Sequence, residues 1–140
     1  MNQHPLILPM LTLLLLTMSV WIYMYIRRLS FLFTKGIDAQ ELQSPQQLQQ
    51  VIPESVNRPA YNLANLFELP IVFYVLCLLA IFTNNIDASL QYLAWCFVVA
   101  RIIHSIIHCS YNTVIHRFIP YFVASLCLWS MLIITVLAYL

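Results

Sequence analysis

Four long runs of apolar residues constrain this chain more than any other feature of its sequence. They cover about residues 6–26, 59–82, 88–109 and 117–140, and a helix of about 20 such residues crosses the hydrocarbon core of a bilayer. In lipid, backbone N–H and C=O groups must bond within their own segment, so each run is predicted to be a helix. The sequence therefore predicts an all-α membrane protein built as a four-transmembrane-helix bundle.

Composition agrees with a lipid environment for residues 1–140, which we predict to form a single membrane domain. Hydrophobic residues make up 62% of the chain and charged residues 8%, whereas soluble domains average about 25% charged residues. The net charge of +1 gives no basic footprint for nucleic acid, so no nucleic-acid partner is expected. The four cysteines form no C-x-x-C pair and are predicted to be free, buried thiols.

Basic residues predict the orientation of the bundle. The long polar stretch of residues 34–57 is predicted to be the first loop, with a short helix over residues 45–51. Basic side chains gather at this loop and at the start of the fourth run, and they are Arg27, Arg28, Lys35, Arg58 and Arg117. Because basic loops stay in the cytoplasm, both termini are predicted to face the non-cytoplasmic side.

Three prolines predict where helices begin or bend. Pro59 suits the first position of the second helix, where no N–H is needed. Pro120 is expected in the first turn of the fourth helix. Pro70 falls inside the second run and predicts a local bend there.

Polar side chains inside the apolar runs mark a candidate site. Arg101, His104 and His108 are spaced so that they share one face of the third helix. Polar residues of the second run also share a face, and they are Arg58, Tyr61, Asn62, Asn65 and Glu68. Each of these two helices thus carries one polar stripe on an otherwise apolar surface.

Two charged groups of opposite sign fall at matched depths in these stripes. Glu68 and Arg101 both lie about 12–15 Å below the cytoplasmic surface, and we predict that they pair. The pair is either a structural clasp between helices or part of a pocket, open to the cytoplasm, that binds an anionic ligand. The surplus of arginines (Arg58, Arg101 and Arg117) over Glu68 favours a ligand that carries carboxylates.

A metal site is the weaker interpretation of the histidines. His104 and His108, four residues apart, have the spacing of two ligands on one helix face, and His116 follows them. No cysteine or acidic residue stands in register to complete a zinc shell. The histidines are therefore predicted to form hydrogen bonds, and no metal is expected.

Three motifs occur together in the polar stripes. They are N-x-x-E at residues 65–68, R-x-x-H at residues 101–104, and Arg117 sixteen residues after Arg101. With this combination the chain resembles the MAPEG family, the membrane-associated proteins in eicosanoid and glutathione metabolism, and in particular its bacterial branch. The resemblance implies a trimer in the bacterial inner membrane, with glutathione as co-substrate bound between subunits near the cytoplasmic side.

The resemblance also assigns roles to residues. It implies that the motif residues of the second and third helices contact the ligand, and that Arg117 stabilises the glutathione thiolate. Two positions depart from the family pattern: Tyr61 stands where arginine is usual, and His108 where tyrosine is common. Arg117 is thus the candidate catalytic residue. The candidate ligand-binding residues are Arg58, Asn62, Asn65, Glu68, Arg101, His104 and His108.

The leading functional hypothesis is a glutathione-dependent membrane transferase or peroxidase of the microsomal type. Its substrates would be lipophilic electrophiles or lipid hydroperoxides drawn from the bilayer. The alternative is a non-catalytic protein of the same fold that binds a lipid or supports assembly. Whether the chain is an enzyme stays open at this point, and the cationic pocket favours catalysis.

Overall fold

All of the regular structure is helical in the residues that a computed structural model describes, which are 5–38, 40, 42 and 44–140. In chain order the helices are α1 (Ile7–Lys35), α2 (Pro45–Val51), α3 (Glu54–Leu66), α4 (Leu69–Phe82), α5 (Ala88–Cys109) and α6 (Val114–Leu137). Four stretches among these residues are long and apolar enough to cross a membrane. The first is α1, the second consists of α3 and α4, the third is α5 and the fourth is α6. The predicted all-α fold with four spanning segments is confirmed, and the chain is an integral, multi-pass membrane protein.

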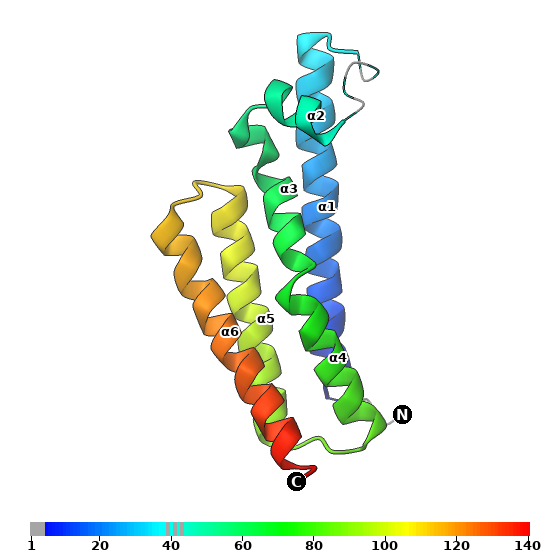
Figure 1. Cartoon of the computed structure of the whole chain (residues 1–140), viewed down its shortest axis with the longest axis vertical. Coiled ribbons are helices and arrows are strands. Elements are labelled where there is room, and N and C mark those ends of the chain that lie inside the picture. Colours follow the sequence, from blue (N-terminus) through cyan, green and yellow to red (C-terminus); the bar gives the residue numbers. More distant parts are fainter. Residues whose placement is uncertain (1–4, 39, 41, 43) are drawn as a thin grey trace.

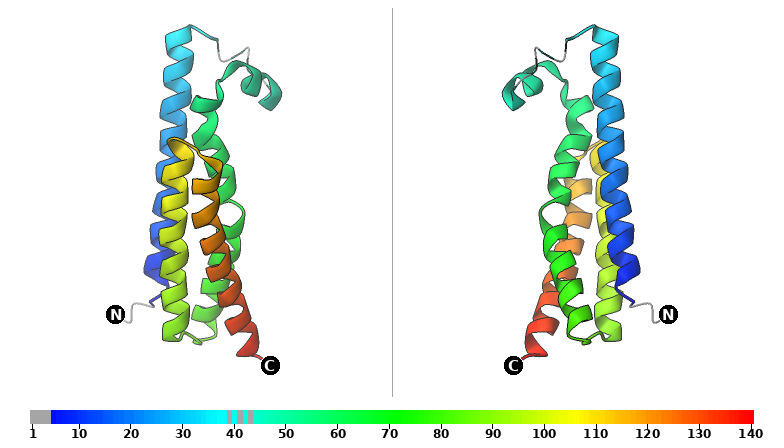
Figure 2. Two further views of the ribbon diagram at one scale, coloured as in Figure 1. Left: turned by 90° about the vertical axis from the view of Figure 1, so that its left-hand side faces the viewer. Right: turned by 90° about the vertical axis from the view of Figure 1, so that its right-hand side faces the viewer.

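The spanning segments run alternately up and down (Figure 1). α1 begins and α6 ends at one end of the bundle, where the turn between α4 and α5 also lies. The opposite end carries the α5–α6 connection, and both the end of α1 and the short helix α2 extend beyond that connection (Figure 2). The polar stripes on α3 and α5 therefore lie toward the end at which α1 protrudes.

α5 is the most buried of the spanning helices although it is the most polar. It packs against α6, α1 and α3, and 44% of its spanning window is buried, against 17% for α6. Its buried polar residues are Arg101, His104, Ser105 and His108. Burial against neighbouring helices keeps these groups out of the hydrocarbon, where each unpaired polar group is costly.

The second span is interrupted between α3 and α4. α3 ends at Leu66, Phe67 and Glu68 leave the helical conformation, and Pro70 occupies the second position of α4. A proline cannot donate to the carbonyl four residues earlier, and its ring clashes with that carbonyl. The bend predicted at Pro70 is confirmed, and it is a break rather than a smooth curve.

Pro59 and Pro120 lie inside helices, so the predicted positions at helix starts are wrong. α3 begins five residues before Pro59, and α6 begins six residues before Pro120. Pro59 leaves the carbonyl of Ser55 without its helical donor, and the Nη2 atom of Arg27 donates to that carbonyl instead, at 3.2 Å. An arginine from α1 thus compensates for a proline within α3.

The predicted short helix over residues 45–51 is confirmed as α2. The Ser44 hydroxyl accepts from the backbone N–H of Gln47, whose side chain accepts from the backbone N–H of Ser44. This capping box satisfies donors that a helix start leaves free. The following residue, Ile52, is buried and anchors α2 to the bundle.

The cysteines are free, as predicted, but they are not all buried. Cys77 is buried, Cys109 and Cys127 are half-buried, and Cys96 is exposed. The prediction of burial was wrong for Cys96, which is exposed at an open apolar cavity between α5 and α6. A small apolar side chain is as compatible with lipid as with a protein core.

Candidate functional site

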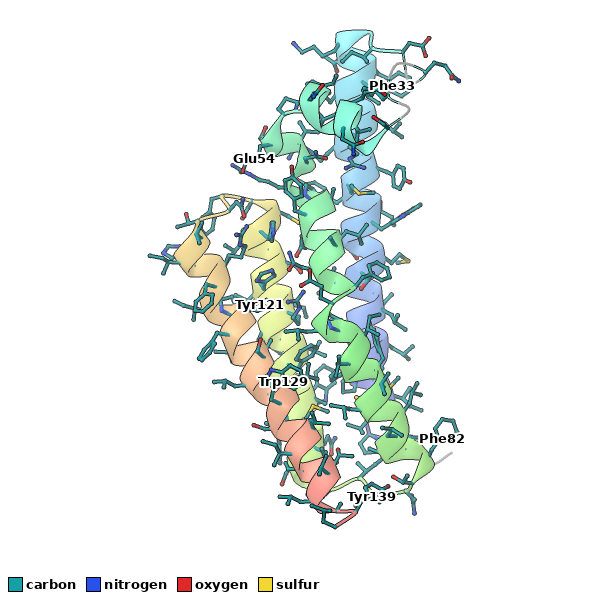
Figure 3. All side chains as sticks on the ribbon, in the orientation of Figure 1. Phe33, Glu54, Phe82, Tyr121, Trp129 and Tyr139 are labelled. Atoms are coloured by element: carbon teal, nitrogen blue, oxygen red, sulfur yellow. The ribbon has the colours of Figure 1, made fainter. Side chains whose placement is uncertain are left out.

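A cavity of about 430 Å³ lies between α3, α5 and α6, near the α5–α6 connection. Four of the predicted site residues line it: Asn65, His104, His108 and Arg117. The remaining lining residues are Glu54, Tyr61, Asn112, Val114, Phe118 and Tyr121. Glu54 lies at the start of α3, and Tyr121 lies further along the bundle on α6 (Figure 3). The volume falls in the range of small-molecule sites.

Hydrogen bonds fix one side of the Arg117 guanidinium. Its Nη1 atom donates to Asn112 Oδ1 at 2.8 Å and to His108 Nε2 at 3.4 Å. Asn112 has a left-handed backbone with φ of 56°, which asparagine tolerates better than most residues, and this turn aims its amide oxygen at the arginine. The Nε and Nη2 atoms of Arg117 make no hydrogen bond within the described chain and remain available to a ligand.

The two cavity histidines are both tied to Arg117. His104 Nδ1 lies 3.0 Å from the carbonyl of Arg117, and because a carbonyl can only accept, this nitrogen carries the proton. In the neutral ring His104 Nε2 is then an acceptor. His108 Nε2 accepts from the guanidinium, so the proton of His108 lies on Nδ1. Both rings thus engage in hydrogen bonds, and no cluster of three His, Cys, Asp or Glu side chains that could hold a metal occurs among the described residues.

Arg101 lies behind the cavity wall and is fully buried. Its Nη2 atom donates to the carbonyl of Asn65 at 2.9 Å, and its guanidinium lies 5.7 Å from the centre of the Tyr121 ring. The Asn65 carbonyl is free because α3 ends one residue later, and a cation at a helix C-terminus is favourable. The helix break therefore creates the acceptor that holds Arg101.

Glu68 does not pair with Arg101, so the predicted contact is wrong. Glu68 is exposed at the start of α4 and does not line the cavity. Arg101 directs Nη2 to Asn65, and its other two nitrogens have no partner. The prediction assumed that the second run forms one regular helix. Because α3 ends at Leu66, the residues after it no longer share a helix face with Asn62 and Asn65.

Arg58 and Asn62 join α3 to α5 and lie outside the cavity lining. Arg58 donates through Nη1 to the carbonyl of Ser110. Asn62 is fully buried; it donates to Cys109 Sγ at 3.5 Å and accepts from Ser105 Oγ at 3.3 Å. These contacts between α3 and α5 resemble the structural clasp considered in the sequence analysis. Their partners, however, are not Glu68 and Arg101.

Three lining residues with polar side chains were absent from the sequence-based prediction: Glu54, Asn112 and Tyr121. Tyr121 had a usable signal, because it follows Arg117 by four residues and so shares its face of α6. Glu54 and Asn112 lie near helix ends, and only the packing of both α3 and α6 against α5 brings them to the cavity.

Buried polar atoms without partners concentrate around this site. Six buried side-chain nitrogen or oxygen atoms in the described chain have no hydrogen-bond partner. Five belong to predicted site residues, Arg58, Arg101, His104 and His108, and the sixth is the Tyr74 hydroxyl. Because buried polar groups in proteins are nearly always paired, these atoms mark hydrogen-bonding capacity that contacts within the described chain do not use.

Comparison with known protein families gives a match to a membrane-protein family. Residues 6–137 match the sequence model of the MAPEG family. No curated protein and no solved structure matches the chain significantly. The match covers all four spanning segments and every residue of the cavity.

Proposed function

Because the chain belongs to the MAPEG family, whose members are membrane-associated proteins in eicosanoid and glutathione metabolism, we propose that it is a glutathione-dependent membrane transferase or peroxidase. Its substrates are lipophilic electrophiles or lipid hydroperoxides. One observation carries the proposal: Arg117 lines the cavity, and its Nε and Nη2 atoms make no hydrogen bond within the described chain. A purely structural role for Arg117 would not need these unused donors at a cavity.

The cavity residues suit a thiol-bearing, zwitterionic ligand. Glutathione, when bound, supplies a thiolate, which is the nucleophilic form of a thiol. The free N–H groups of Arg117 would stabilise that negative charge. Glu54 is the only carboxylate among the described lining residues, and it matches an ammonium group.

Tyr121 supplies a hydroxyl that the sequence lacked at position 108. Its ring lies 5.7 Å from both the Arg101 guanidinium and the His104 ring, which limits its motion. Its hydroxyl has no hydrogen-bond partner in the described chain and is not buried, and Tyr121 lines the cavity. We propose that Tyr121 takes the place of the tyrosine that many family members carry where this chain has His108.

Orientation and assembly are part of the same proposal. Lys35 ends α1, Arg58 lies early in α3 and Arg117 early in α6, so these charges gather at one end of the bundle. By the positive-inside rule this end and the cavity face the cytoplasm, with both termini on the other side of a bacterial inner membrane. A trimer would also cover Glu68, whose exposed carboxylate is costly against lipid.

A second candidate function is lipid binding without catalysis. A separate apolar cavity of about 670 Å³ lies between α5 and α6, lined by residues such as Trp95, Val99 and Val123. It suits an acyl chain entering from the bilayer, whether as substrate or as cargo. This candidate predicts lipid binding that is independent of glutathione.

The test measures binding and turnover on purified protein in detergent. Calorimetric titration with glutathione gives affinity, and a chlorodinitrobenzene-type electrophile and a lipid hydroperoxide give turnover. We expect Arg117→Ala to lower kcat/KM by about 100-fold, because it removes the group that stabilises the thiolate. Ile115→Ala is the matched control, since Ile115 is exposed on the same turn and lines neither cavity.

Absence of both glutathione binding and turnover in the unaltered protein would overturn the enzymatic proposal. Lipid binding in that same protein would then support the second candidate. Equal losses in Arg117→Ala and Ile115→Ala would show that the effect is structural.

A further inference from the structure

A third cavity, of about 280 Å³, lies where α1 meets the start of α3. Arg27, Ser30, Thr34 and Lys35 contribute two cations and two hydroxyls to its lining, and Val56 and Phe31 contribute apolar surface. Among the described residues, no carboxylate lines it. Residues eight apart on α1 thus face one small space with a single sign of charge, which suits an anion.

Arg27 is held in place before any ligand binds. Its Nη1 atom donates to the Tyr23 hydroxyl at 2.8 Å, and its Nη2 atom donates to the Ser55 carbonyl at 3.2 Å. A guanidinium has five N–H groups, so three remain for an anion. A cation fixed in this way loses little conformational freedom on binding.

The length of α1 places this cavity at the level of the lipid headgroups. The 29 residues of α1 span about 44 Å at 1.5 Å per residue, longer than the hydrocarbon core of about 30 Å. The apolar run of α1 ends at Ile26, directly before Arg27. The cavity-lining residues that follow therefore emerge from the hydrocarbon.

The apolar part of the cavity lining distinguishes a lipid from a free anion. Ile26, Phe31 and Val56 line the cavity beside its two cations. A soluble phosphate would gain nothing from these side chains, whereas acyl chains would cover them. We propose that this cavity binds the phosphate of an anionic phospholipid, at a site separate from the glutathione cavity.

The test compares phosphatidylglycerol with phosphatidylcholine, each added in mixed micelles to the purified full-length protein, with bound lipid counted by native mass spectrometry. Phosphatidylglycerol should bind preferentially. Each of Arg27→Gln and Lys35→Gln should weaken its binding by about fivefold, because each removes one cation near the phosphate. Lys35 is exposed and makes no hydrogen bond in the described chain, so its variant should fold normally.

Arg28→Gln is the matched control for loss of charge, and its thermal unfolding is measured alongside because Arg28 binds the buried Asn57. Arg28 follows Arg27 directly but binds Asn57 Oδ1 and does not line the cavity. Equal weakening by all three variants, or no preference for phosphatidylglycerol, would overturn the proposal. Full displacement of the lipid by inorganic phosphate would assign the cavity to a soluble anion instead. The glutathione proposal stands or falls separately, on Arg117.

Discussion

At the scale of single residues, two faces of one guanidinium have different tasks. The Nη1 side of Arg117 is fixed by Asn112 and His108, and the opposite edge is free. Fixing one edge removes much of the rotational freedom of a long side chain, so the free edge is aimed before a ligand arrives. Glu54 lines the same cavity, so a ligand there can contact an acidic side chain as well as the basic one.

Glu54→Gln should weaken the binding of glutathione specifically through its ammonium group. We expect KM for glutathione to rise by about tenfold, because a charge-assisted hydrogen bond is replaced by a neutral one. N-acetylglutathione lacks the ammonium, and its KM should be the same for both proteins. Steady-state kinetics with the two thiols checks this, and equal changes for both thiols would contradict the assignment.

Arg28 and Asn57 offer a test of stability away from the cavity. Arg28 donates through Nε and Nη2 to Asn57 Oδ1, at 3.2 and 2.7 Å, and Asn57 is buried. Arg28→Met should destabilise the protein by about 1–3 kcal/mol, because it leaves this oxygen unpaired. The double variant with Asn57→Leu should recover most of the loss, since no polar group then stays unpaired. Thermal unfolding in detergent measures both effects, and additive losses would contradict the argument.

At the scale of elements, the break between α3 and α4 organises the site. It exposes Glu68 and frees the Asn65 carbonyl that holds Arg101. Arg101 in turn lies against the Tyr121 ring, so a proline in one helix influences a tyrosine in another. The break thus joins backbone geometry to the shape of the cavity.

Pro70→Ala should allow α3 to continue into α4. The Asn65 carbonyl would then accept the backbone N–H of Leu69 as in a regular helix, and Arg101 would lose its partner. We expect glutathione affinity to fall by about tenfold, from loss of preorganisation, while the protein stays folded. Calorimetric titration and thermal unfolding check the two parts. Unchanged affinity would show that Pro70 does not control the break.

At the scale of the whole molecule, polarity is distributed unevenly along the bundle. The polar cavity lies toward the end where α1 protrudes. The opposite half has an apolar core, in which the stacked rings of Phe73 and Phe97 have their centres 4.6 Å apart. The proposed orientation puts the polar half at the cytoplasmic face, where glutathione is available. It also leaves the apolar half within the membrane.

Cysteine labelling should establish this orientation. In a variant without the four native cysteines, Gln46→Cys on α2 should react with a membrane-impermeant maleimide only in inside-out vesicles. Tyr139→Cys, near the end of α6, should react only from the outside. Figure 1 places α2 and the end of α6 at opposite ends of the bundle, so each variant is a control for the other. The reverse pattern would move the cavity to the non-cytoplasmic side.

The sequence by itself determined the four spans, the short helix α2 and part of the site. Lipid forces each apolar run to satisfy its own backbone as a helix, so the spans need no tertiary information. The capping residues Ser44 and Gln47 act locally in the same way. His104 and His108 could be grouped because helical periodicity fixes which residues share a face within one uninterrupted helix.

Only the tertiary structure decided which charged groups meet. The break before Pro70 turned Glu68 outward, and packing placed Arg101 behind the cavity wall. Packing of both α3 and α6 against α5 brought Glu54 and Tyr121 to one cavity. Helical spacing carries no information across a break or between helices, because these relations depend on where each helix ends and how its neighbours pack.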